Sequence, residues 1–236
     1  MLKARYLAAG FFLTLAGTAG PAAAQRPVVV ELFTSEGCSS CPPADALLAE
    51  LALRPDVLAL SFHIDYWDRL GWKDPFSSSA ATLRQQHYAG LFDTGSVYTP
   101  QIVVDGHWQA VGSDRDAVER AITAAEGAPS AIPVTLSVDR ARARVTLGPG
   151  GERVRGSVVL VAFDRRHVDA VARGENSGRT LTHVDVVRGL AEAGPLDSRT
   201  RAIEAAIPAP ADRLAAILQS DDGRILGAAV ADLPQR

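Results

Sequence analysis

The chain has 236 residues, of which 47% are hydrophobic, and a formal net charge of −3 at pH 7. The hydrophobic fraction is that of a globular protein with a substantial core. Proteins that bind nucleic acid are usually basic, so the slight acidic excess argues against that class and we expect no nucleic-acid partner.

The first 24 residues have the pattern of a secretory signal peptide. Lys3 and Arg5 form a positive start, residues 6–15 form a short apolar segment, and the alanines at 22–24 suit a cleavage site. The apolar segment is shorter than the roughly 20 residues that a membrane-spanning helix needs. We therefore predict cleavage after Ala24 and a mature protein that is periplasmic or secreted, without a membrane span.

The next hundred or so residues alternate between strand and helix patterns. Strands are expected at 28–33, 56–64, 97–105 and 107–111, and helices at 44–53, 79–92 and from a cap at Ser113-Asp114 to about Ala125. Strands that alternate with helices predict a partly parallel sheet with helices on both faces.

Beyond a linker at 127–131 the pattern changes to short strands, at 132–138, 143–147, 157–163, 182–187, 203–207, 215–219 and 225–230. Such strands, separated by turn signals, indicate a β-sandwich-like module. We predict a signal peptide (1–24), an α/β domain (25–129) and a smaller β-rich domain (130–236).

The two cysteines of the chain, Cys38 and Cys41, are spaced as C-x-x-C between the first strand and the first helix. A disulfide between residues three apart closes a very small loop and contributes little to stability. A thiolate is stabilised at a helix N-terminus by free N–H groups and the helix dipole. We assign Cys38 as the exposed nucleophile and Cys41 as the thiol that resolves the mixed disulfide.

Two segments resemble the thioredoxin-like superfamily. GCSSCPPADALLAEL (37–51) resembles its active-site segment, and TPQIVVDG (99–106) resembles the segment that carries a cis-proline. The resemblance covers about residues 27–127 and implies a thioredoxin-like three-layer fold. It also implies a cis bond before Pro100 and backbone groups of Thr99 that pair with an extended substrate beside the cysteines.

A third segment, GENSGRTLTHVDVVRGL (174–190), is similar to part of a largely uncharacterised family of exported bacterial thioredoxin-like proteins. Within it, His183, Asp185 and Arg188 could make a polar contact with the first domain. Substrate contacts are expected from four residues beside the two cysteines or the cis-proline: Ser39, Ser40, Trp67 and Tyr98.

Pro42 and Pro43 leave two possible helix starts. Proline suits the first helical turn, so the helix could begin at Pro42 or Pro43, with Cys38 about one turn before it. Alternatively it could begin near Cys38, as the resemblance implies. Ser39 and Ser40 add no charge, which leaves both redox directions open.

The resemblance also implies a buried carboxylate beneath the second cysteine, at the position of Leu32. Glu31, one residue earlier, is our candidate for proton transfer; the alternative is a strand glutamate paired with a basic group. Glu36 is a second, more exposed candidate. Polar and aromatic residues after the second strand could either wall the cysteines or pack locally: His63, Asp65, Tyr66, Trp67, Asp68 and Trp72.

The pattern as a whole predicts an exported thiol–disulfide oxidoreductase or redox partner. Its partners would be protein or small-molecule thiols and disulfides, and no cofactor or resident metal is expected. One alternative is a Cu(I) or zinc carrier that uses the two thiolates and adds His63 or Asp65 as a ligand. Another is a non-catalytic binding module on the same fold.

Overall fold

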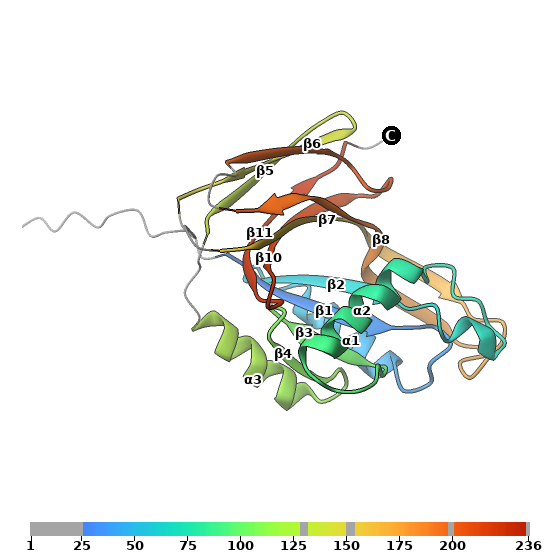
Figure 1. The fold of residues 1–236 in the computed structure, drawn as a ribbon. Coiled ribbons are helices and arrows are strands. Elements are labelled where there is room, and N and C mark those ends of the chain that lie inside the picture. The colour runs from blue at the N-terminus through green and yellow to red at the C-terminus, as the bar shows by residue number, and fades with distance from the viewer. Residues whose placement is uncertain (1–25, 128–131, 150–153, 198–200, 235–236) are drawn as a thin grey trace, which may run out of the picture.

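A computed structural model describes residues 26–127, 132–149, 154–197 and 201–234. The predicted signal peptide and most of the predicted linker lie outside these ranges. The described chain forms an eight-stranded mixed sheet, with strand order β11-β10-β7-β8-β2-β1-β3-β4, and a three-stranded antiparallel sheet, β5-β6-β9 (Figure 1).

The strands of the large sheet are β1 (Val28–Thr34), β2 (Val57–His63), β3 (Gln101–Val104), β4 (Trp108–Val111), β7 (Gly156–Ala170), β8 (Thr180–Leu196), β10 (Arg213–Ser220) and β11 (Ile225–Asp232). The small sheet contains β5 (Val134–Asp139), β6 (Arg142–Leu147) and β9 (Ala202–Ala206). The helices are α1 (Pro42–Leu51), α2 (Ser79–Leu91), α3 (Arg115–Glu126) and the 3₁₀ turn η1 (Asp68–Leu70). None of these helices is long and apolar enough to cross a membrane.

Alternate residues of the central strands enter different hydrophobic cores, which explains their continuous apolar sequences. In β1, Val30 and Leu32 pack with α1 and α3, whereas Val29 and Phe33 enter a second core that includes residues of α2. The strands β7 and β10 likewise divide their side chains between this second core and a third, which they share with the small sheet.

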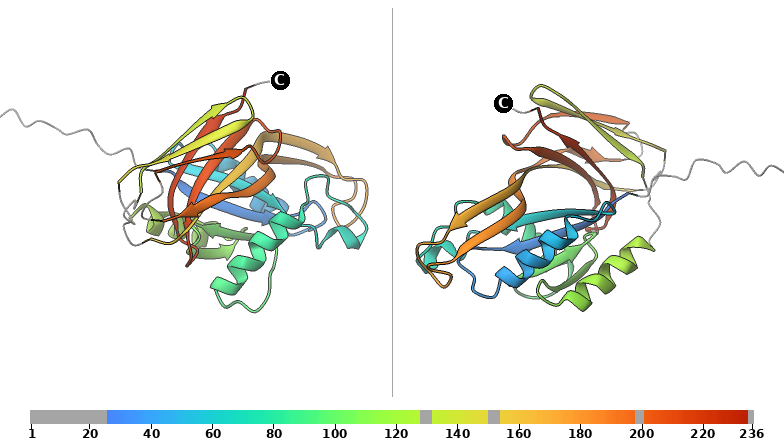
Figure 2. Two further views of the ribbon diagram at one scale, coloured as in Figure 1. Left: turned by 45° about the horizontal axis from the view of Figure 1, so that its top comes forward. Right: turned by 180° about the vertical axis from the view of Figure 1, so that it is seen from behind.

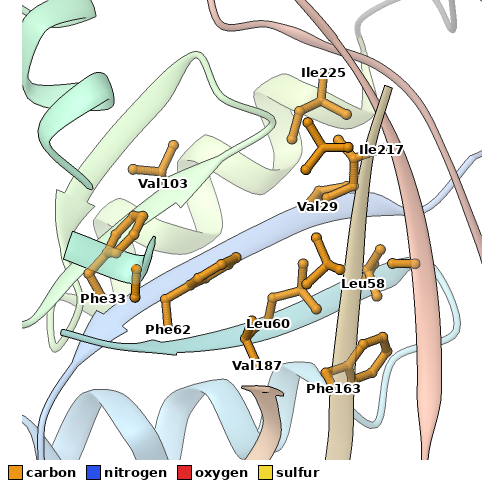
Figure 3. Packing of buried hydrophobic residues seen from close by; sticks show 14 of the residues in the cluster. Val29, Phe33, Leu58, Leu60, Phe62, Val103, Phe163, Val187, Ile217 and Ile225 are labelled. Atoms are coloured by element: carbon orange, nitrogen blue, oxygen red, sulfur yellow. The ribbon is translucent and has the colours of Figure 1, made fainter. Parts of the chain in front are cut away.

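The large sheet bends so that its two ends meet. Val103 of β3 and Ile225 of β11 belong to one core, although five other strands lie between β3 and β11 in the sheet (Figure 3). The Ile225 N–H donates to the carbonyl of Asp105 at 2.9 Å and joins these ends directly. The second core is therefore enclosed between the first and last parts of the chain.

The strands on the two sides of residue 130 share this sheet, an arrangement that the sequence pattern did not predict. β8 runs parallel to β2, with Ser61 opposite Val186. β7 and β8 are also much longer than expected. β7 continues past Phe163 to form a polar hairpin with the start of β8, and β8 continues past Val187 to Leu196 along the first half of β7. Figure 2 shows this hairpin (orange, right panel) reaching the ends of β1 and β2.

Candidate functional site

Cys38 and Cys41 form a disulfide, with their Cα atoms 5.4 Å apart, between the end of β1 and the start of α1. α1 begins at Pro42 with Cys41 as its N-cap residue. Of the two possible starts, the later one is therefore correct. Proline fits there because the first helical turn needs no N–H donor. Cys38 precedes the helix by about one turn and accepts the Cys41 N–H at its carbonyl, at 3.2 Å.

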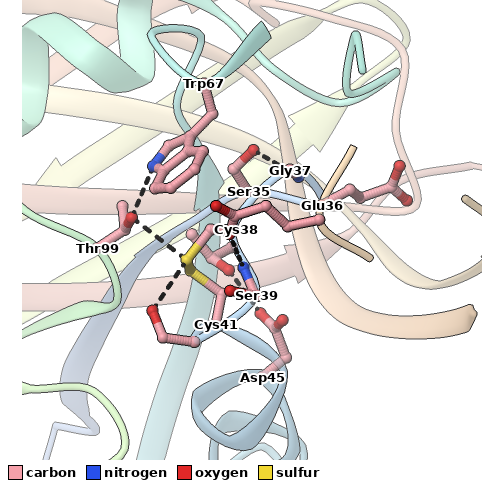
Figure 4. Close-up of a disulfide and its surroundings, with 12 residues drawn as sticks. Ser35, Glu36, Gly37, Cys38, Ser39, Cys41, Asp45, Trp67 and Thr99 are labelled. Carbon is pink, nitrogen blue, oxygen red and sulfur yellow. Dashed lines mark hydrogen bonds between the residues drawn. A yellow bond between two sulfur atoms is a disulfide. The ribbon is translucent and has the colours of Figure 1, made fainter. Parts of the chain in front are cut away.

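Neither cysteine has any exposed surface, so the expectation that Cys38 is exposed is wrong for the disulfide form. The Thr99 hydroxyl lies 3.4 Å from the Cys38 Sγ, and the Ser40 hydroxyl lies 3.4 Å from the same atom. In Figure 4 the indole of Trp67 lies above this group. Ser40 itself is exposed, so one of the side chains that contact Cys38 reaches the solvent.

The Thr99–Pro100 peptide bond is cis, as the resemblance implies. Thr99 contacts Cys38 through its side chain: its hydroxyl accepts a hydrogen bond from Trp67 Nε1 at 2.9 Å and donates to the Cys38 Sγ. The structure therefore places Thr99 at the Cys38 sulfur and Trp67 at Thr99.

Two other residues expected to contact substrate are arranged differently. Ser39 is exposed, and its backbone N–H is already bonded to Glu175 at 3.0 Å. The Tyr98 hydroxyl donates to the side chain of Gln109 at 3.0 Å, so the Tyr98 side chain is directed towards β4. Its carbonyl accepts from Gln85 of α2 at 2.6 Å, so Tyr98 anchors the loop that leads to Thr99.

Glu31 is paired with a basic group, which is the alternative interpretation of this residue. Arg84 of α2 contacts it at 2.6 and 3.0 Å, and the Tyr88 hydroxyl donates to the same carboxylate. Because side chains alternate along a strand, Glu31 faces α2, whereas α1 covers the opposite face of β1. The assignment of Glu31 to proton transfer at Cys41 is therefore wrong.

The buried carboxyl group next to the pair is Asp45, which our sequence analysis missed. It lies one turn of α1 after Cys41 and accepts a hydrogen bond from the Thr34 hydroxyl at 2.9 Å. Burial raises the pKa of Asp45, although the charges of His183 and His63 oppose this effect. The signal was present: an acidic residue on the apolar face of the predicted helix.

Behind Asp45 lies a group of buried polar side chains. His63 Nδ1 lies 2.7 Å from Asp74 Oδ2, and His183 Nε2 lies 3.3 Å from Glu36 Oε1. The two imidazole rings are in edge contact, with centroids 4.7 Å apart. Glu36 is completely buried, so the expectation that it is more exposed than Glu31 is wrong. His183 makes the polar contact between the two halves that the sequence indicated.

Burial, charges and hydrogen bonds shift the pKa values of two members of this group. Burial alone would raise the pKa of Asp74, but the charge and hydrogen bond of His63 outweigh it, so the pKa is lowered. Burial alone would lower the pKa of His183, but the hydrogen bond to Glu36 and the charge of Asp45 raise it.

The residues after β2 are divided between the two expected roles: Trp67 contacts Thr99, whereas the Asp65 carboxylate accepts from Thr82 of α2 at 2.6 Å.

The tip of the β7–β8 hairpin completes the site. The buried Asn176 donates from its side-chain nitrogen to the carbonyls of Glu36 and Cys38, both at 2.9 Å. Glu175 accepts the Ser39 N–H. Both residues lie within the segment 174–190 that carried the closer resemblance, but the sequence pattern gave no indication of these contacts. They join residues more than 130 positions apart.

The metal-carrier alternative receives no support from the geometry. Within the residues that the structure describes, no three or more His, Cys, Asp or Glu side chains are placed to hold a metal ion. The two extra ligands considered are already engaged, His63 by Asp74 and Asp65 by Thr82.

Two solved structures are similar to this chain. Protein AGR_C_4864 from Agrobacterium tumefaciens is 29% identical with a TM-score of 0.74, and the match covers 91% of this chain and 100% of that chain. HBP35 of Porphyromonas gingivalis is 16% identical with a TM-score of 0.63, over 89% of this chain and 76% of that chain, a likeness of fold alone. No curated protein matches. Residues 29–219 match the family described as "Protein of unknown function (DUF1223)", and the chain therefore belongs to the DUF1223 family.

Proposed function

We propose that this protein is an exported thiol–disulfide oxidoreductase whose first half, residues 26–127, is a thioredoxin-like domain. The observation that carries the proposal is the Cys38–Cys41 disulfide before α1, with Thr99, the residue before cis-Pro100, placed against its first sulfur. The order strand, helix, strand, helix, strand, strand, helix supports the proposed fold.

The exchange proceeds in two steps. The Cys38 thiolate attacks a substrate disulfide, so that a Cys38–substrate bond forms, the substrate S–S bond breaks and one substrate thiolate leaves. Cys41 then loses its proton and attacks the Cys38 sulfur, which restores the Cys38–Cys41 disulfide and releases the second substrate thiolate. The substrate gains two electrons and the protein loses two; the reverse sequence oxidises a substrate dithiol.

Asp45 is the group that we assign to the proton of Cys41. Burial raises the pKa of Asp45, and a buried carboxyl group of this kind can act as a general acid or base. The Thr34 hydrogen bond orients it, and its position one helical turn after Cys41 places it on the resolving side of the pair.

The buried sulfur requires an opening step. Thr99, Trp67 and Ser40 surround Cys38, and Ser39 and Ser40 are both exposed. We propose that substrate approaches over these two serines and that the side chains around Cys38 rearrange to expose the sulfur. The thiol or disulfide substrate is then held beside the Thr99–Pro100 loop.

The signal-peptide pattern at 1–24 supports the proposed export, and an oxidising compartment is where a disulfide persists. N-terminal sequencing of protein recovered from a periplasmic or secreted fraction tests this. We expect a chain that begins after Ala24, and an uncleaved cytosolic chain would contradict export.

The central experiment is redox titration of the mature protein in glutathione buffers, with alkylation to count free thiols, alongside assays of insulin reduction and RNase oxidation. We expect a reversible two-electron transition and exchange activity in one direction. Cys38→Ser should abolish exchange, and Cys41→Ser should trap a mixed disulfide on Cys38.

A binding module without turnover is the second candidate, and one observation favours it: neither sulfur is exposed. In that case the disulfide would resist glutathione in the folded protein, and no mixed disulfide would accumulate in Cys41→Ser. That result would end the oxidoreductase proposal.

A further inference from the structure

The β7–β8 hairpin brings a carboxylate to the loop that contains the proposed nucleophile. Glu175 Oε2 accepts the backbone N–H of Ser39 at 3.0 Å. Ser39 directly follows Cys38, so the negative charge lies within one residue of the sulfur that must ionise. This glutamate comes from the distant half of the chain and is exposed to solvent.

The hairpin is held in this place by a buried contact. Asn176, next to Glu175, donates to the carbonyls of Glu36 and Cys38, both at 2.9 Å. Its side-chain oxygen accepts from Arg179 Nη1 at 2.9 Å, so the cation of the same hairpin is directed to Asn176. The contacts of Asn176 therefore hold the backbone of Glu175 close to Ser39, and the Glu175 carboxylate needs only its own side chain to reach the Ser39 N–H.

Two physical effects follow for Cys38. Backbone N–H groups that point at a thiolate stabilise it, and the N–H of Ser39, the residue directly after Cys38, is occupied by a different anion. A nearby like charge also disfavours ionisation of a thiol. The hydrogen bond to Ser39 likewise lowers the pKa of Glu175, which keeps this carboxylate charged.

We propose that Glu175 is a positioning residue for the proposed redox site, which disfavours the Cys38 thiolate and so stabilises the Cys38–Cys41 disulfide. The inference rests on the proposed function, because it concerns the reactivity of the same pair. It gives the C-terminal half a chemical role: the hairpin sets how readily the pair accepts electrons.

The test uses the full mature chain and three substitutions. Glu175→Gln removes the charge but keeps an oxygen acceptor, Glu175→Ala removes both, and Glu175→Asp keeps the charge. The matched control is Glu192→Gln, which removes an exposed carboxylate from β8 opposite Val159, far along the hairpin from its tip.

Two readouts separate tuning from simple folding defects. The Cys38 pKa is measured by ultraviolet absorbance of the thiolate after reduction with a phosphine. The equilibrium with glutathione is measured separately; there the disulfide takes up two electrons and two protons as two glutathione molecules form one glutathione disulfide. Thermal unfolding checks that each variant is folded.

We expect Glu175→Gln to lower the Cys38 pKa by roughly half a unit and to shift the glutathione equilibrium about threefold towards the dithiol. Glu175→Ala should shift both in the same direction, and Glu175→Asp should resemble the unchanged protein. An unchanged Cys38 pKa in Glu175→Gln and Glu175→Ala, or an equal shift in Glu192→Gln, would overturn the inference.

Failure of the proposed function gives a different result. In that case the unchanged protein shows no glutathione equilibrium and no exchange, whatever residue stands at 175. The phosphine-reduced pKa still reports on Glu175 alone, so the two outcomes are distinguishable.

Discussion

The Thr99 hydroxyl lies 3.4 Å from the Cys38 Sγ, although 61 positions of sequence separate the two residues. The same hydroxyl accepts the indole N–H of Trp67 at 2.9 Å, which leaves its proton available for the sulfur. A hydroxyl oriented in this way stabilises a thiolate more than it stabilises a neutral thiol. The Thr99–Pro100 loop thus contributes a hydrogen-bond donor to the Cys38 sulfur.

Thr99→Val should therefore raise the Cys38 pKa by about one unit, since a hydrogen bond to a charged group contributes roughly 1.5 kcal/mol or more. The thiolate absorbance of the reduced protein measures this. The control Thr135→Val changes an exposed threonine of β5 and should leave the pKa unaltered. An unchanged pKa in Thr99→Val would mean that the hydroxyl does not reach the thiolate in the reduced protein.

Asp45→Asn should slow resolution of the mixed disulfide roughly 100-fold at neutral pH, because asparagine cannot accept the Cys41 proton. The free energy of unfolding should stay equal or rise, since the substitution removes a buried acid with a raised pKa and keeps the acceptor for Thr34. Stopped-flow exchange and urea unfolding measure the two effects.

The control for Asp45→Asn is Asp116→Asn, which changes an exposed acid in the first turn of α3. Its exchange rate should equal that of the unchanged protein. Equal rates in both variants would remove Asp45 from the mechanism.

Glu31→Leu should lower the free energy of unfolding by about 3–5 kcal/mol, because it leaves the buried Arg84 without its counter-charge. The double variant Glu31→Leu/Arg84→Met should recover most of this loss, and its Cys38 pKa should match that of the unchanged protein. Urea unfolding and thiolate absorbance measure these. A double variant that is stable but unable to resolve mixed disulfides would return Glu31 to the reaction.

Asp185 should make the protein less stable as the pH rises from about 3.8 to about 6. Burial raises its folded-state pKa to about 6, so the folded state retains a proton that the unfolded chain has released. The free energy of unfolding falls across this window and stays lower above it. Asp185→Asn should therefore stabilise the protein by about 1–2 kcal/mol at neutral pH and by little near the acidic end of the window.

Urea unfolding at several pH values tests the Asp185 prediction. Asparagine is suitable here because Asp185 has a φ of 46°, a conformation that asparagine tolerates. The exposed Asp221 provides the control Asp221→Asn, which should show no such difference. A gain from Asp185→Asn that is independent of pH would mean that ionisation is not its cause.

Much of the local structure was predictable. The seven elements of the first half and the seven later strands occur close to the expected positions, because apolar periodicity reports directly on which faces are buried. The lengths of β7 and β8 were not predictable: the second half of β7 is polar, and the second half of β8 contains Gly189, Gly194 and Pro195, residues that weaken a strand pattern. The strand predicted at 97–105 begins only at Gln101, after the cis-proline.

The sequence by itself determined the local setting of the pair: two cysteines at C-x-x-C spacing between a strand and a helix, and a Thr-Pro segment with a cis bond. The tertiary structure alone decided their surroundings. It buried Cys38 and turned Glu31 towards Arg84. It also brought Asn176 and Glu175 into contact with the backbone of Cys38 and Ser39. Periodic patterns report on the faces of single elements, whereas these contacts depend on how a bent sheet brings distant segments together.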